Sequence, residues 1–129
     1  MHEKALVIDD DKVITMALKI RLCAAGYDMS SSPDGISGLK AVQEKRPDVI
    51  LLDIRMPGMD GLEVNRRLKA APELSDIPVI VVSAQAQQAT RQGALAAGVK
   101  YFLPKPYDAA QLVALIEATT TETVCAADS

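Results

Sequence analysis

Short apolar runs alternate with helical patterns along this chain, and that alternation constrains the fold more than any other feature. The runs that predict strands cover residues 5–8, 27–31, 48–53, 77–83 and 99–103. A stretch with apolar residues at helical spacing follows each of them. Parallel strands joined through helices make right-handed crossovers, so we expect an α/β fold: a doubly wound, five-stranded parallel sheet with helices on both faces.

The start of the second helix has the clearest local signal. Ser32 is predicted to be its N-cap, with Pro33 in the first turn, because a side-chain oxygen followed by proline is typical of helix starts. The apolar spacing predicts that this helix buries Ile36, Leu39 and Val42.

The last two helical patterns differ in strength. Residues 85–97 are rich in Ala and Gln and contain Gly93, which predicts a poor helix. The final helix carries Leu112, Ile116 and Thr119 on one face, and the periodicity then stops. We therefore predict one domain over residues 1–119 and a frayed tail over residues 120–129.

Composition narrows the class of protein. The 129 residues suffice for one domain, and the net charge of −3 argues against nucleic acid as a direct partner. The N-terminus lacks the apolar stretch of a secretory signal. No apolar run approaches the roughly 18 residues that span a bilayer. We expect a cytoplasmic protein without membrane contact, in which Cys23 is a small buried residue.

Polar residues stand where the apolar runs end. Asp9 and Asp10 follow the first run, Asp53 and Ser83 close the third and fourth, and Lys105 lies just past the fifth. The carboxyl ends of parallel strands share one edge, where open α/β proteins bind ligands. In the strand order 2-1-3-4-5, Asp10 and Ser83 flank Asp53 at about 4.8 Å per strand. The long side chain of Lys105 can reach them from the fifth strand.

The three acids in this set predict a cation. At ~5 Å and an effective dielectric near 20, each ionised pair repels by roughly 3 kcal/mol, so a proton or a cation must offset the repulsion. Hard oxygen ligands suit Mg²⁺, which usually keeps several waters. We predict Asp10 and Asp53 as direct ligands and Asp9 as a ligand through metal-bound water, with Mn²⁺ as the alternative ion. Asp11 is expected only to cap the first helix.

Four segments carry a resemblance to a known family. They are residues 7–11 (VIDDD), 51–61 (LLDIRMPGMDG), 82–84 (VSA) and 102–107 (FLPKPY). In this order and at these separations, the chain resembles the receiver domain of two-component response regulators, including the single-domain, CheY-like members. The resemblance covers about residues 4–119 and implies a flavodoxin-like fold.

The resemblance also implies roles for individual residues. Asp53 would take a phosphoryl group from a histidine kinase or a histidine phosphotransfer protein, and the backbone carbonyl of Arg55 would complete the Mg²⁺ site. The Ser83 hydroxyl and the Lys105 ammonium would bind phosphoryl oxygens. Ser83 and Phe102 would form a switch that re-shapes the surface of the fourth helix, fifth strand and fifth helix for a downstream protein. We expect no enzymatic activity beyond the chain's own phosphorylation and slow dephosphorylation.

Two alternatives stay open. Met1 and the short tail favour a stand-alone protein, but a receiver module excised from a larger regulator or hybrid kinase would have the same sequence features. An aspartyl-nucleophile phosphatase is less favoured, because such enzymes typically carry a second acid two residues after the nucleophile, where this chain has Arg55. Neither GxxxxGK nor GxGxxG follows the first strand, which argues against nucleotide binding.

Overall fold

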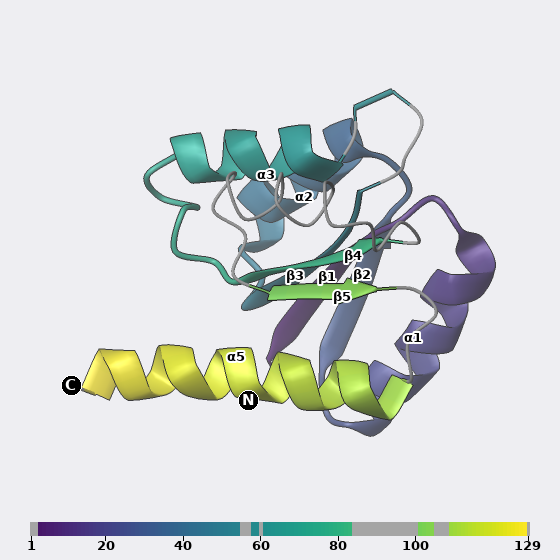
Figure 1. Ribbon diagram of the computed structural model, residues 1–129, viewed down its shortest axis with the longest axis vertical. Coiled ribbons are helices and arrows are strands. Elements are labelled where there is room, and N and C mark those ends of the chain that lie inside the picture. The colour runs from purple at the N-terminus through teal and green to yellow at the C-terminus, as the bar shows by residue number, and fades with distance from the viewer. Residues whose placement is uncertain (1–2, 55–57, 60, 84–100, 105–108, 129) are drawn as a thin grey trace.

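A five-stranded parallel sheet forms the centre of the molecule in the computed structural model, which describes residues 3–54, 58–59, 61–83, 101–104 and 109–128 (Figure 1). The elements, in chain order, are β1 (Lys4–Ile8), α1 (Lys12–Ala24), β2 (Asp28–Ser32), α2 (Gly35–Lys45), β3 (Val49–Asp53), α3 (Gly61–Ala70), β4 (Val79–Ser83), β5 (Tyr101–Pro104) and α5 (Ala109–Asp128). The helix expected over residues 85–97 lies outside the described residues.

The strand order is β2-β1-β3-β4-β5, and every neighbouring pair is parallel. The predicted fold class and strand order are therefore confirmed. β3 occupies the middle position, and all five of its residues are buried. This burial explains why its sequence runs Val-Ile-Leu-Leu without polar alternation, since helices cover both faces of the sheet.

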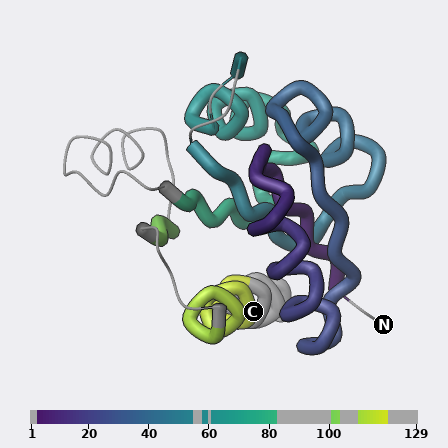
Figure 2. The backbone as a smooth tube through the Cα atoms, turned by 90° about the vertical axis from the view of Figure 1, so that its right-hand side faces the viewer, coloured from purple at the N-terminus to yellow at the C-terminus, as the bar shows by residue number. Residues whose placement is uncertain are grey.

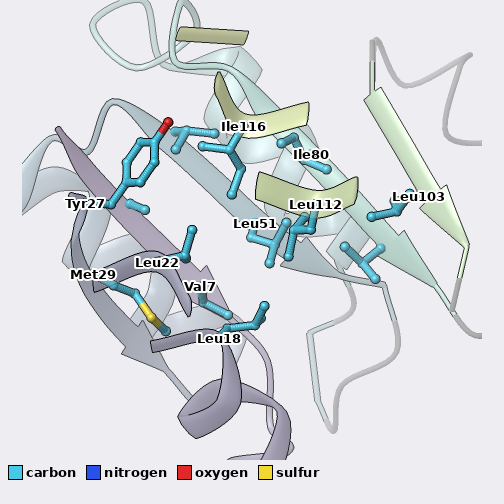
Figure 3. Close-up of a cluster of buried hydrophobic side chains, with 13 residues drawn as sticks. Val7, Leu18, Leu22, Tyr27, Met29, Leu51, Ile80, Leu103, Leu112 and Ile116 are labelled. Carbon is cyan, nitrogen blue, oxygen red and sulfur yellow. The ribbon is translucent and has the colours of Figure 1, made fainter. Parts of the chain in front are cut away.

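Two hydrophobic cores lie on opposite faces of the sheet. Figure 1 shows α2 and α3 on one face and α1 and α5 on the other, and Figure 2 shows α1 and α5 side by side. Alternate residues of each strand contribute to alternate cores, as the pleat requires. The α1/α5-side core, drawn in Figure 3, contains Val7, Leu18, Leu22, Tyr27, Met29, Leu51, Ile80, Leu103, Leu112 and Ile116 among its buried members.

The start and the end of α1 follow the sequence signals. Asp11 is its N-cap, and the Asp11 carboxylate accepts hydrogen bonds from the backbone N–H groups of Val13 at 3.0 Å and Ile14 at 3.3 Å. Gly26, directly after the C-cap residue, has φ +94°, the left-handed conformation that glycine adopts at this position without a Cβ penalty. The capping role expected for Asp11 is confirmed.

The prediction for the start of α2 is wrong. Its N-cap is Asp34, whose carboxylate accepts from the Ser37 backbone N–H at 2.8 Å. Ser32 instead remains in the sheet as the last residue of β2, where its carbonyl accepts from the Asp9 N–H at 3.1 Å. The hydrogen bond from Ser37 is the main reason that the pKa of Asp34 lies below its usual value.

The predicted inner face of α2 is correct for Val42 and wrong for Ile36. Ile36 is 71% exposed, whereas Gly38 and Val42 are buried and Leu39 is partly buried. The reason is close packing against β1: a Cβ on Gly38 would lie 2.6 Å from Cδ1 of Ile8. Glycine, not the large aliphatic residue, therefore faces the sheet at the first turn.

The outer face of α3 carries a local ion-pair network. Arg66 donates to both carboxylate oxygens of Glu63, from Nε at 2.7 Å and from Nη2 at 2.6 Å. The Arg66 guanidinium holds the pKa of Glu63 below its usual value. Lys69 Nζ donates to the carbonyl of Ser75 at 3.0 Å. These contacts agree with an exposed helix face.

The end of the chain differs from the expectation. α5 continues to Asp128, so residues 120–128 are helical where we predicted fraying, while the boundary of the domain itself stays a prediction. No glycine or proline interrupts this segment, and extending an existing helix requires no new nucleus.

Cys23 also departs from expectation, because it is exposed. Within the described part of the chain, none of the helices combines the length and the apolar character that crossing a bilayer would need.

Candidate functional site

Three aspartates meet at the carboxyl edge, the edge of the sheet where the parallel strands end. Asp9 and Asp10 follow β1, and Asp53 is the last residue of β3. One carboxylate oxygen of each lies within 4.8 Å of those of the other two. Asp9 and Asp53 are each only 7% exposed, whereas Asp10 is exposed to solvent. The sequence predicts that these three acids lie together, and the structure confirms it.

The pairing of β1 with β3 explains why Asp9 meets Asp53. Ile8 is paired with Leu52, so the next level of the same register holds Asp9 and Asp53. Alternate residues of a strand face the same side, and the two acids therefore continue the series that supplies Val7 and Leu51 to the α1/α5-side core. A parallel register thus places two acids far apart in sequence at adjacent positions.

Backbone contacts hold Asp9 from both directions. Its N–H donates to the carbonyl of Ser32 in β2 at 3.1 Å, and its Oδ1 accepts from the N–H of Asp11 at 2.9 Å. Asp11 in turn caps α1. The three consecutive acids therefore have different roles. Asp9 is buried and fixed, Asp10 is exposed at the cluster, and Asp11 caps α1.

Asp53 is held by the backbone on either side of it. It pairs with Val82 of β4, and the following N–H, that of Ile54, donates to the Val82 carbonyl at 3.1 Å. The carbonyl of Ile54 then accepts from the N–H of Gly61 at 2.8 Å, which closes the connection between β3 and α3. Gly61 was not singled out by the sequence analysis. The signal available was a glycine directly before an apolar helical pattern.

Of the other four predicted site residues, the structure describes two, Ser83 and Phe102. Ser83 ends β4 one residue beyond Val82, the partner of Asp53, and is paired with Pro104 of β5. Phe102 is partly buried and packs against the core on the α2/α3 side of the sheet, whose buried members include Ile8, Leu52 and Val64. Arg55 and Lys105 lie outside the described residues. The roles of these four residues stay predictions.

The donor set at the carboxyl edge fits a divalent cation. All three side chains offer carboxylate oxygens, the hard ligands that Mg²⁺ and similar ions prefer. Two are nearly buried, so their mutual repulsion is poorly screened by water. The exposed Asp10 leaves the cluster open to solvent. The cluster is therefore compatible with metal binding.

The chain is similar to proteins of known type. A family model described as the response regulator receiver domain matches residues 5–117. The transcriptional regulatory protein CseB of Streptomyces avermitilis is 41% identical over 113 residues, which cover 88% of this chain and 47% of that protein. The response regulator MprA of Mycobacterium ulcerans is 36% identical over 133 residues, with 100% and 56% covered. The chain thus spans about half the length of these relatives.

Solved structures give the same picture. The chemotaxis protein CheY4 of Vibrio cholerae superimposes with a TM-score of 0.87 at 26% identity, covering 92% of this chain and 99% of that one. The receiver domain of the Francisella response regulator 1452 superimposes with a TM-score of 0.88 at 29% identity, covering 95% and 99%. Both similarities cover more than nine-tenths of this chain.

Proposed function

The chain belongs to the family of response regulator receiver domains, and from this premise we propose that it accepts a phosphoryl group on the carboxylate of Asp53. A receiver domain is the acceptor in a two-component phosphorelay. The observation that carries the choice of residue is the position of Asp53: it ends a fully buried strand, and two further acids lie within 4.8 Å. An acid at such a position does not stabilise the strand that it ends.

The proposed step is a phosphoryl transfer from phosphohistidine. An oxygen of the Asp53 carboxylate forms a bond to phosphorus while the phosphorus–nitrogen bond breaks, and the electron pair of that bond stays with the departing imidazole. The product is an acyl phosphate. Such a transfer needs positioning and charge neutralisation more than covalent machinery, which agrees with an acceptor fixed by sheet hydrogen bonds.

Asp9, Asp10 and the backbone carbonyl of Arg55 would hold Mg²⁺ beside Asp53, and bound Mg²⁺ supplies neutralisation of negative charge between carboxylate and phosphoryl oxygens. Asp9 suits an indirect role, because its Oδ1 already accepts from the N–H of Asp11. The Ser83 hydroxyl and the Lys105 ammonium would bind phosphoryl oxygens. Ser83 and Phe102 would pass the change to the surface that includes β5 and α5, where a downstream protein would bind.

A histidine kinase or a histidine phosphotransfer protein is the proposed donor, and the outer face of α1 is where we place its contact. α1 begins directly after the acid cluster. It presents Val13, Met16 and Ile20 at 78%, 68% and 71% exposure, spaced three and four residues apart. Large apolar side chains aligned on one exposed helix face mark a protein-binding surface.

The chain itself would act as a substrate and switch, not as an enzyme on other molecules: it would catalyse only its own phosphorylation and slow dephosphorylation.

A second candidate is that this receiver is one module of a longer regulator. Relatives about twice as long favour this candidate, because the matched residues form only about half of CseB and MprA. CseB is named a transcriptional regulator, and in a longer regulator the contact with DNA would lie outside the receiver module.

Acetyl phosphate tests the acceptor function without a partner protein. The chain is incubated with this small phosphodonor, with Mg²⁺ or with a chelator, and its intact mass is followed. We expect one phosphoryl group per chain in Mg²⁺, none in the chelator, and none in Asp53→Asn. Equal labelling of Asp53→Asn, or fast turnover of many phosphates per chain, would contradict the proposal.

A further inference from the structure

Gly61, the first residue of α3, lies unusually close to the backbone of Asp53. A Cβ built on Gly61 would lie 2.7 Å from Cα of Ile54 and 2.9 Å from the carbonyl carbon of Asp53, and closer still to the Asp53 carbonyl oxygen. Real Cβ atoms essentially never approach other heavy atoms within 3.0 Å. The residue is buried, so the side chain of any other amino acid would have no open space to turn into.

The atoms that Gly61 approaches distinguish it from the other glycines in the described part of the chain. At Gly38 the three atoms nearest to a methyl group would all belong to the side chain of Ile8, which can adopt another rotamer. At Gly26 and Gly58 it would meet nothing within 4 Å, and these two glycines are explained by positive φ angles of +94° and +79°. At Gly61 the three nearest atoms are all backbone atoms of Asp53 or Ile54. Relief there requires a shift of the main chain itself.

The same glycine closes the connection that leaves the acceptor. The N–H of Gly61 donates to the carbonyl of Ile54 at 2.8 Å, which brings the start of α3 against the end of β3. Asp9, by contrast, is fixed through β2 and through the cap of α1. Asp9 and Asp53 are therefore held through different elements, and the contact described for Gly61 of α3 is with the backbone of Asp53.

We infer that Gly61 is a positioning residue for phosphorylation: the absence of a side chain allows α3 to dock directly on the backbone of Asp53 and sets where its carboxylate lies relative to Asp9 and Asp10. This inference rests on the proposed function of Asp53. A methyl group at position 61 displaces the Asp53 backbone while the other two acids keep their places. A displacement of about 1 Å at a reacting group can slow a reaction about 100-fold.

The test compares three single substitutions to alanine. Gly61→Ala adds the collision with Asp53. Gly58→Ala, in the same connection, and Gly26→Ala, behind α1, each place alanine at a positive φ and in open space, so both lose stability without that collision. The folded fraction is measured by circular dichroism, the labelling rate with acetyl phosphate by intact mass, and Mg²⁺ affinity by amide chemical shifts in the unphosphorylated chain.

We expect Gly61→Ala, at full folded fraction, to label about tenfold or more slowly than wild type and to bind Mg²⁺ more weakly. Gly58→Ala and Gly26→Ala should keep wild-type labelling and Mg²⁺ affinity despite lower melting temperatures. If Gly61→Ala does not fold in buffer, the assay is repeated in trimethylamine N-oxide, which favours compact states.

Three results overturn the inference. The first is wild-type labelling and Mg²⁺ affinity in folded Gly61→Ala. The second is equal slowing in all three variants, and the third is a Gly61→Ala chain that stays unfolded in the osmolyte, since the contact would then support the fold alone. Failure of the proposed function has a different signature: the wild-type chain would not be labelled, or Asp53→Asn would be.

Discussion

The two edges of the sheet use aspartate in opposite ways. At the edge where the strands begin, Asp48 joins two strands: its Oδ2 accepts from the backbone N–H of Lys4 at 2.7 Å, and its own N–H donates to the Lys4 carbonyl at 2.8 Å. At the carboxyl edge, Asp9, Asp10 and Asp53 crowd within 4.8 Å. One acid fastens two strands together, whereas the other three repel one another.

The difference separates structural acids from functional ones. A carboxylate that accepts from a backbone N–H satisfies a donor and stabilises the fold, whereas clustered carboxylates destabilise it unless a cation offsets their charge. The acid cluster at the carboxyl edge is therefore expected to lower the stability of the metal-free chain, whereas Asp48 is expected to raise it. Such instability is typical of sites where function, not folding, selects the residues.

The largest expected difference between the edges is in phosphorylation. Asp10→Asn removes a proposed Mg²⁺ ligand and should slow labelling by acetyl phosphate on the order of 100-fold, a loss comparable with those seen when metal-site partners are removed. Asp48→Asn, at the other edge, should label at the wild-type rate. Equal rates for the two variants, measured by intact mass at the same Mg²⁺ concentration, would remove the functional distinction.

The next effect concerns the donor, which must approach the carboxyl edge over α1. Met16→Glu and Ile20→Glu place charge on the exposed apolar face of that helix and should reduce transfer from a phosphorylated donor protein about tenfold, because burying a charge in an apolar interface is unfavourable. Transfer from acetyl phosphate should stay unchanged in both. Ala24→Glu, exposed near the far end of α1, is the control. Unimpaired transfer from the protein donor would place its contact elsewhere.

A smaller effect is expected on stability, with opposite signs at the two edges. In a chelator, Asp10→Asn should raise the free energy of unfolding by about 1 kcal/mol, since it removes like-charge repulsion. Asp48→Ala should lower that free energy by about 1 kcal/mol through the lost hydrogen bond from Lys4. Saturating Mg²⁺ should stabilise wild type more than Asp10→Asn. Urea unfolding measures all three, and a destabilised Asp10→Asn in chelator would show that the cluster supports the fold.

The smallest effect is a pH dependence at the N-cap of α2. The pKa of Asp34 lies below 3.8 because its carboxylate accepts hydrogen bonds from Ser37. A depressed pKa contributes stability that is fully present above 3.8 and is lost as the pH falls through the lower, folded-state pKa. Asp34→Ala should thus be less stable than wild type near neutral pH, and the gap in urea midpoint should narrow below pH 3.8. A gap that stays constant with pH would argue against this carboxylate as the cap.

The sheet and the acid cluster could be predicted because both depend on where apolar runs end. Every predicted strand is present. The parallel pairing of β1 with β3 places Asp9 beside Asp53, and this could be predicted without knowing how the loops fold. Boundaries are harder to predict: Ser32 belongs to β2, so the N-cap of α2 comes later, at Asp34, and the helix begins at Gly35. Hydrogen bonds to a neighbouring strand decide that boundary, and a local capping pattern does not contain them.

The contacts that the sequence could not predict depend on three-dimensional approach. Ile36 fits the apolar spacing of α2 yet is exposed, and Gly38 instead packs against Ile8 of β1. The approach of Gly61 to Asp53 depends likewise on how the connection after β3 folds back. The continuation of α5 to Asp128 has no apolar stripe to mark it. Each of these features arises from packing between elements, whereas periodicity reports on one element at a time.

Borohydride reduction of the phosphorylated chain tests the central claim most directly, because hydride converts an aspartyl acyl phosphate to homoserine and so marks the acceptor covalently. After labelling in Mg²⁺, reduction, proteolysis and peptide sequencing by mass spectrometry, we predict homoserine at position 53 and at no other aspartate. Homoserine at position 9 or 10, or labelled protein in which every aspartate survives reduction, would contradict the assignment of Asp53.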